Sequence, residues 1–212
     1  MEDLPLRRDR ILEAALPHVL FDGWTRRALE TGGTDLGLDP LEVSRAFPGG
    51  MAEVVEHFSN LADRWMVADM SSRHSKDLPV HEAIALAVRL RLERLNPNRE
   101  AVRRALAFLA LPGHHVIASR CTYRTVDAIW RVVGDRSTDF NFYTKRALLA
   151  GVYAATLVYW LGDDSENFER TWRFLDRRIA DVVGAIKARR RLTNSISSVF
   201  SGLRPRWHVF GR

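Results

Sequence analysis

Apolar residues recur along nearly the whole chain at the three- and four-residue spacing of an α-helix, and no stretch alternates convincingly as a β-strand does. The first predicted helix ends before Asp22 and Gly23, and Pro17 within it is expected to kink or break it. Short helices are predicted from Thr25 and, capped by Asp39, from Pro40 to about Phe47. Long helices are predicted over 51–73, 80–95, 98–110, 113–133, 140–161 and 165–187. The pattern predicts an all-α protein.

The front of the chain shows the order of a helix-turn-helix followed by a long helix. Its motifs resemble the DNA-binding half of the tetracycline-repressor family: Ile11–Ala15, Gly23-Trp24-Thr25, Leu36-Gly37-Leu38 and Phe47. The second short helix would present Asp39, Glu42 and Arg45, and residues 1–50 hold nine acids against six bases. DNA affinity comes largely from neutralising phosphates, so we expect this half to keep the repressor fold as a structural scaffold without binding DNA. The alternative is a ligand-responsive transcriptional regulator.

Composition and charge exclude several classes of protein and site. The 212 residues are 46% hydrophobic, which fits an ordinary globular protein, and the single cysteine, Cys121, excludes an intrachain disulfide or a CxxC zinc site. The net charge of +6 arises from the end of the chain, since seven basic residues and no acid lie between Lys187 and Arg212. The first 20 residues lack the apolar core of a signal peptide and are too acidic for a transit peptide, so we expect the chain to act where it is made.

The basic tail also carries an apolar stripe at helical spacing. A polar, uncharged face of serines, threonine and asparagine lies opposite it, which is typical of a helix that inserts into a membrane interface beside anionic headgroups. The predicted membrane-binding residues are Arg189, Arg190, Arg191, Leu192, Ile196, Val199, Phe200, Leu203 and Trp207. Two alternatives remain open: the stripe packs on the body or on another subunit, or the tail is disordered and binds nucleic acid.

The stretch from Ala147 to Leu161 contains no charged residue, but its 15 residues are fewer than the roughly 20 needed to cross a bilayer. The simplest interpretation is a helix buried on all sides. The other interpretation is a helix that lines an apolar ligand cavity or a dimer seam, where Gly151 and Ala154 permit close approach. In the cavity interpretation, the predicted lipid-binding residues are Leu148, Leu149, Val152, Tyr153, Thr156 and Trp160.

A second resemblance covers most of the chain. Three segments closely resemble the ninth coenzyme Q (ubiquinone) biosynthesis protein family: 127–130 (DAIW), 134–147 (GDRSTDFNFYTKRA) and 168–175 (FERTWRFL). The resemblance implies a repressor-like fold that has lost DNA binding and that binds isoprenoid quinone intermediates or other lipids. It also implies a partner, the di-iron hydroxylase that acts on demethoxyubiquinone.

The helix predicted over 113–133 holds the candidate partner surface. On a helical wheel, Asp127 and Arg131 lie on the solvated arc, and Trp130 and Tyr123 lie at its border. A tryptophan beside charges is typical of an interface anchor, although periodicity alone equally allows a peripheral core position. The family resemblance places a tryptophan and a neighbouring aspartate on the hydroxylase-docking surface, so we expect Trp130, Asp127, Tyr123 and Arg131 to bind that partner.

The sequence gives little indication of an enzyme, because the chain has no HExxH motif, no glycine-rich phosphate loop and no GxSxG motif. We therefore expect no catalytic residues, no metal site and no cofactor. The predicted organisation is a helix-turn-helix-like subdomain over 1–50, a helical lipid-binding bundle over 51–187 and a basic amphipathic tail over 188–212. We expect a homodimer formed through the last two long helices. The expected location is peripheral, on the cytoplasmic face of a bacterial inner membrane, or on the mitochondrial matrix face if a transit peptide is missing.

Overall fold

A computed structural model describes residues 3–73, 78–134 and 140–184, and all regular structure within these ranges is helical, which confirms the predicted fold class. The helices are α1 (Leu4–Asp22), α2 (Arg26–Asp35), α3 (Pro40–Ala46), α4 (Gly50–Ser72), α5 (Val80–Leu95), α6 (Arg99–Leu109), α7 (His115–Val132), α8 (Phe140–Leu161) and a last helix over 169–184. Two short 3₁₀ turns, η2 (Asn96–Asn98) and η3 (Glu166–Phe168), connect neighbouring helices. The predicted bounds of α5 and α8 agree with the structure. The predicted membrane-binding tail lies outside the described residues.

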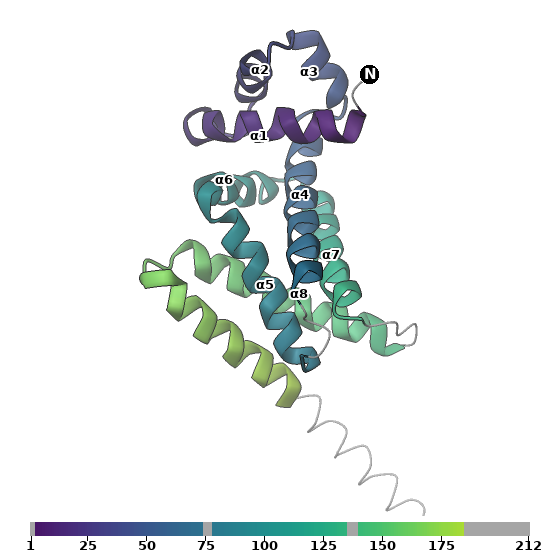
Figure 1. The fold of residues 1–212 in the computed structure, drawn as a ribbon, viewed down its shortest axis with the longest axis vertical. Helices are drawn as coiled ribbons and strands as arrows, with labels where there is room; N and C mark the ends of the chain where they lie inside the picture. Colours follow the sequence, from purple (N-terminus) through teal and green to yellow (C-terminus); the bar gives the residue numbers. More distant parts are fainter. Residues whose placement is uncertain (1–2, 74–77, 135–139, 185–212) are drawn as a thin grey trace, which may run out of the picture.

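The three short N-terminal helices form one end of the molecule (Figure 1). Thr25 caps α2 by accepting a hydrogen bond from the Ala28 backbone amide, and α3 begins with a capping box between Asp39 and Glu42. A Cβ atom on Gly32 would lie 2.5 Å from the Ala15 backbone nitrogen. Glycine at this position therefore permits α1 and α2 to pack backbone against backbone.

Helix α1 continues through Pro17 to Asp22, so the predicted break does not occur. Proline cannot donate the amide hydrogen bond that the Glu13 carbonyl would accept one turn earlier. Pro17 and Glu13 are both exposed, so water can satisfy that carbonyl, while Leu16 and Val19 on the other face are buried.

Ion pairs and an aromatic contact join the N-terminal end to the rest of the protein. Asp9 of α1 accepts hydrogen bonds from Arg64 and His57 of α4, at 2.5 Å and 2.7 Å for the shortest contacts. Trp24 packs on Phe58 of α4, with 5.2 Å between ring centroids, and its indole N–H donates to the carbonyl oxygen of Ala101 in α6 at 3.0 Å. The N-terminal helices are thereby fixed to both α4 and α6.

Below this end, α4, α5, α7 and α8 form a bundle, with α6 between α1 and the bundle (Figure 1). The core contains large apolar side chains from each helix, among them Met66, Leu92, Ile129 and Trp160, all fully buried. The last helix lies along α5, where the Arg89 guanidinium sits 5.1 Å from the centroid of the Trp172 ring. Such a bundle can enclose a ligand between its helices.

Helix α8 is not buried on all sides, contrary to the simplest interpretation of its uncharged sequence. Val152, Leu157 and Trp160 are buried, whereas Gly151, Ala154 and Ala155 are exposed and Val158 is 66% exposed. The small apolar residues thus form one outward strip. The self-association expected through this helix stays a prediction.

Asp163 fixes the start of the last helix. Its carboxylate accepts hydrogen bonds from the amide of Ser165 and from both the amide and the hydroxyl of Thr171, at 2.6–2.9 Å. Burial alone would raise the pKa of Asp163, but these donors outweigh it and lower the pKa to about 2. Arg99 and Arg103 of α6 donate to the last carbonyl groups of α8, so the turn that reverses the chain is held from two sides.

Candidate functional site

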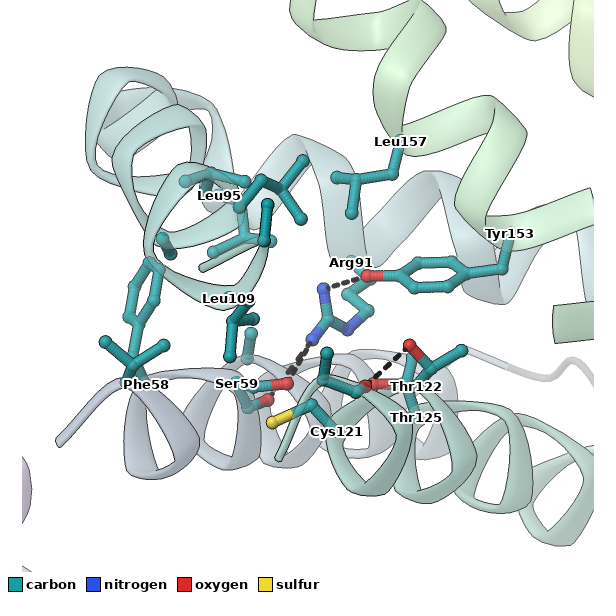
Figure 2. A pocket seen from close by; sticks show the side chains of 17 residues that line it. Phe58, Ser59, Arg91, Leu95, Leu109, Cys121, Thr122, Thr125, Tyr153 and Leu157 are labelled. Carbon is teal, nitrogen blue, oxygen red and sulfur yellow. Dashed lines mark hydrogen bonds between the residues drawn. The ribbon is translucent and has the colours of Figure 1, made fainter. Parts of the chain in front are cut away.

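A cavity of about 260 Å³ lies between α4, α5, α6, α7 and α8 (Figure 2). Most of its wall is apolar and comes from every one of these helices. The apolar lining consists of Val55, Phe58, Ala62, Leu95, Val102, Ala105, Leu106, Leu109, Ala110, Ala118 and Leu157. The volume suits a small organic molecule or part of a larger one.

A polar cluster forms one part of the wall around Arg91, which is only 3% exposed. The Arg91 Nε atom donates to Oδ1 of Asp63 at 2.8 Å, and Nη1 donates to the hydroxyl oxygen of Tyr153 at 2.7 Å. Its Nη2 atom donates to the carbonyl and hydroxyl oxygens of Ser59, both at 3.2 Å. Thr125 of α7 also donates to Asp63, at 2.8 Å. The cluster therefore joins α4, α5, α7 and α8.

The ionisation of this cluster follows from its burial. Burial raises the pKa of Tyr153, so the phenol keeps its proton at neutral pH. Burial alone would lower the pKa of Arg91, but Tyr153 and Asp63 raise it above its ordinary value. Burial likewise raises the pKa of Cys121, which lines the same cavity and stays a thiol.

A second cavity, of about 240 Å³, lies between the start of α5, the end of α7, α8 and the last helix. Apolar side chains dominate its lining: Val80, Ile84, Trp130, Leu148, Leu149, Val152, Ile179, Val182 and Val183, with His81 and Lys145. The Lys145 ammonium lies 5.4 Å from the centroid of the Trp130 ring, a cation–π distance.

The six predicted lipid-binding residues do not share one cavity. Tyr153 lines the first cavity, whereas Leu148, Leu149 and Val152 line the second. Thr156 is fully buried, donates to the Val152 carbonyl and lines neither cavity. Trp160 is also fully buried and packs against Phe168 and Arg99. Because helix α8 runs between the two cavities, its neighbouring residues face different spaces.

Sequence reasoning missed the polar cluster. Arg91 follows Ala87 and Val88 by one helical turn and precedes Leu95 by another, so it lies on the apolar face of α5. Asp63 likewise falls among the buried apolar residues of α4. A charge on each of two apolar faces is a signal for a buried ion pair, and this signal was present in the sequence.

The predicted partner surface is only partly at the surface. Tyr123 is 50% exposed and Arg131 points outward, but Trp130 is 8% exposed. Asp127 was expected on the solvated arc, and that expectation is wrong, because Arg146 of α8 covers it with hydrogen bonds of 2.8 Å and 2.9 Å. Arg131 pairs with the other oxygen of Asp127 at 2.7 Å. Only the packing of α8 against α7 produces this burial.

Among the described residues, no three histidine, cysteine, aspartate or glutamate side chains gather where they could hold a metal ion. A search of the same residues finds no helix with the length and apolar character to cross a membrane.

The fold is that of the TetR class of helical proteins. A TetR transcriptional regulator from Nitrosomonas europaea ATCC 19718 superposes with a TM-score of 0.67, covering 82% of this chain and 96% of that one, at 22% sequence identity. This likeness confirms the predicted repressor-like fold.

The chain belongs to the COQ9 family. The family model matches residues 116–185, and the ubiquinone biosynthesis proteins COQ9 of rat and human are each 34% identical over 92% of this chain. COQ9-B of Xenopus laevis is 30% identical and is covered over 69% of its length. The chain spans 64% of the rat protein and 63% of the human one, less than two thirds of either. The family membership confirms the resemblance stated above.

Replacing Arg91 tests the role of the buried cluster in stability. In Arg91→Met, the Asp63 carboxylate loses the closer of its two charged partners inside the bundle, which is expected to lower the free energy of unfolding by about 3–5 kcal/mol. The double variant Arg91→Met with Asp63→Leu removes both charges and is expected to be more stable than the single variant. Urea denaturation measures both, and a single variant within about 1 kcal/mol of the wild type would contradict the assignment.

Proposed function

We propose that this protein takes up an isoprenoid quinone intermediate, or another lipid of this kind, at a membrane and presents it to the hydroxylase of demethoxyubiquinone. The observation that carries the proposal is the apolar cavity with a buried polar cluster in its wall. The names of the relatives, ubiquinone biosynthesis proteins, supply the pathway. In this proposal the protein supplies no reactive centre, and the chemistry belongs to the partner.

A lipid carrier is useful because a polyisoprenoid tail is costly to expose to water. Each buried CH₂ group gains about 0.8 kcal/mol, so even part of a tail inside the first cavity contributes several kcal/mol. A cavity of about 150 Å³ accepts one benzene ring. A cavity of about 260 Å³ therefore accommodates a ring and a short piece of tail. The remainder of a long lipid must be covered by the membrane, the partner or the second cavity.

Membrane attachment is assigned to the tail, whose residues 188–212 lie outside the described residues. The support is its sequence: three consecutive arginines followed by an apolar stripe. A helix as short as this is marginal in water, so it is expected to fold when it binds. The protein is then peripheral, on the inner face of a bacterial membrane or of the mitochondrial inner membrane.

Partner docking is assigned to the exposed surface around Tyr123 and Arg131 on α7. Trp130, which precedes Arg131 in the chain, is mostly buried beside Lys145 and adds little exposed area to this surface. An exposed tyrosine beside an arginine provides apolar area and hydrogen bonds together, as interface anchors do.

The transcriptional-regulator alternative rests on the fold alone. Helix α3 exposes Leu41, Ser44 and Arg45, while Glu42 turns back toward Arg7 at 2.5 Å and toward the backbone of its own N-terminus. One arginine on so short a helix gives little phosphate neutralisation.

Cys121, as the single cysteine, reports on occupation of the first cavity. The probe is a ubiquinone analogue with one isoprenyl unit and a fully substituted ring, so that no thiol can add to a ring C–H position. With the probe at ten times its Kd, alkylation of Cys121 by N-ethylmaleimide is expected to slow by about tenfold. The rate is followed by intact-protein mass spectrometry after the protein has been stripped of lipid.

The matched control moves the thiol to the outer face of the same helix, as Ser119→Cys in a Cys121→Ser background, because Ser119 is exposed. The probe is expected to leave the alkylation rate of this introduced thiol unchanged. Equal rates for Cys121 with and without the probe would rule out occupation of this cavity.

Flotation with vesicles tests the tail. A chain ending at Lys187 is expected to lose flotation with anionic phosphatidylglycerol vesicles, because both the apolar stripe and the arginines are gone. The full chain with Arg189, Arg190 and Arg191 changed to Gln is expected to lose about 3 kcal/mol of binding on anionic vesicles and little on neutral ones. A truncated chain that floats as well as the full chain would disprove the assignment.

Tyr123→Ala tests partner docking. Truncation of an exposed anchor is expected to weaken association with the demethoxyubiquinone hydroxylase by about tenfold or more, while binding of the quinone analogue stays unchanged. Val116→Ala, which shortens another exposed apolar side chain of α7, is the control. Biolayer interferometry gives both affinities, and equal binding by Tyr123→Ala and the wild type would refute this surface.

A further inference from the structure

The hydroxyl group of Tyr153 has an unused hydrogen in the wall of the first cavity. Its oxygen accepts the hydrogen bond from Arg91 Nη1, so its own O–H must point elsewhere. Within the part of the chain that the structure describes, no acceptor for this hydrogen is found, although Tyr153 is only 5% exposed. A buried donor without an acceptor is costly unless something else supplies one.

Most of the other polar groups of the cluster already make hydrogen bonds. Asp63 Oδ1 accepts from Arg91 and Thr125, and Ser59 accepts from Arg91 through both of its oxygens. Arg91 itself has one Nη1 hydrogen beyond the four contacts it makes. The second oxygen of Asp63 accepts no hydrogen bond, but Asp63 does not line the cavity. What the cluster offers to a molecule in the cavity is therefore the unused hydrogens of Tyr153 and Arg91.

The charges of the cluster are already balanced. Arg91 is paired with Asp63. Arg124, whose Nε atom lies 3.6 Å from the second oxygen of Asp63, is itself paired with Glu56 at 3.3 Å. A carboxylate or phosphate ligand would therefore bring an uncompensated charge into an apolar space. A neutral carbonyl or hydroxyl oxygen uses the donors without that cost.

The polar and apolar groups of the wall are unevenly distributed. Figure 2 shows Tyr153 and Thr125 toward one side of the cavity, Phe58, Leu95 and Leu109 toward the other, and Arg91 between them. A ligand with one oxygenated end and one hydrocarbon end fits this wall in one orientation, with its oxygenated end beside Tyr153 and its hydrocarbon end beside the apolar residues.

We propose that the cavity binds the ring end of its lipid, with a neutral ring oxygen of a quinone or phenol accepting a hydrogen bond from the Tyr153 hydroxyl, which Arg91 holds in place. The first isoprenoid carbons then lie against Phe58, Leu95 and Leu109. This inference rests on the proposed function and adds to it the class of head group and the direction of the lipid. Tail-first binding, in which hydrocarbon fills the whole cavity, is the opposing outcome.

The test uses Tyr153→Phe in the full chain, with two probes measured by equilibrium dialysis. One probe is the ubiquinone analogue with a single isoprenyl unit, and the other is prenylbenzene, a hydrocarbon with the same tail and no ring oxygen. Loss of one hydrogen bond to a buried oxygen is expected to weaken quinone binding by about tenfold. Prenylbenzene binding is expected to change by less than about twofold, because its contacts are all apolar.

Tyr159→Phe makes the same chemical change on an exposed residue outside the cavity and is expected to leave both affinities unchanged. Thermal unfolding of each variant checks that the fold persists. A second readout is the infrared carbonyl stretch of the bound quinone, expected at lower frequency in the wild type than in Tyr153→Phe.

The outcomes separate the two proposals. Unchanged quinone affinity in Tyr153→Phe, an equal loss for both probes, or wild-type binding of the hydrocarbon but not of the quinone would overturn head-first recognition and leave lipid binding in place. Binding of neither probe by the wild type would overturn both.

Discussion

The buried contact between Arg91 and Asp63 is the constraint on which the bundle depends. It is a buried charge contact between α4 and α5, and Tyr153 and Thr125 extend it to α8 and α7. Each charge would be strongly unfavourable alone in this environment, so the four helices must keep the relative positions that pair them. Apolar packing by itself tolerates small shifts between helices, whereas this network does not.

The same network keeps a cavity open beside it. Arg91 and Tyr153 are held by specific partners, and they cannot turn into the neighbouring space without breaking hydrogen bonds in a medium where water does not replace them. The apolar residues opposite belong to helices fixed elsewhere, α6 by Trp24 and α8 by Arg99 and Arg103. The cavity is therefore a consequence of rigid walls, and a ligand that fills it adds apolar contacts without first having to displace a packed core.

Much of the fold followed from the sequence, because helical periodicity and capping are local. Asp39 and Glu42 form the expected capping box, and α5 and α8 have their predicted bounds. The residues of the site were harder to predict, because the burial of each side chain depends on which other helix packs against it. Asp127 looked solvated on a wheel of α7 alone, and only Arg146 of α8 makes it buried. The uncharged run in α8 gave no hint that its neighbours Val152 and Tyr153 line two different cavities.

The N-terminal helices have a structural role that does not need DNA. Trp24 donates to the backbone of α6, and Arg104 of α6 donates to the Leu20 carbonyl of α1, so the first helices hold α6 from outside. Helix α6 in turn supplies Val102, Ala105 and Leu106 to the cavity wall. Removing these helices would expose the outer face of α6 and loosen the apolar end of the cavity. The front half of the chain therefore supports, through α6, the part of the cavity wall against which the hydrocarbon part of the ligand would lie.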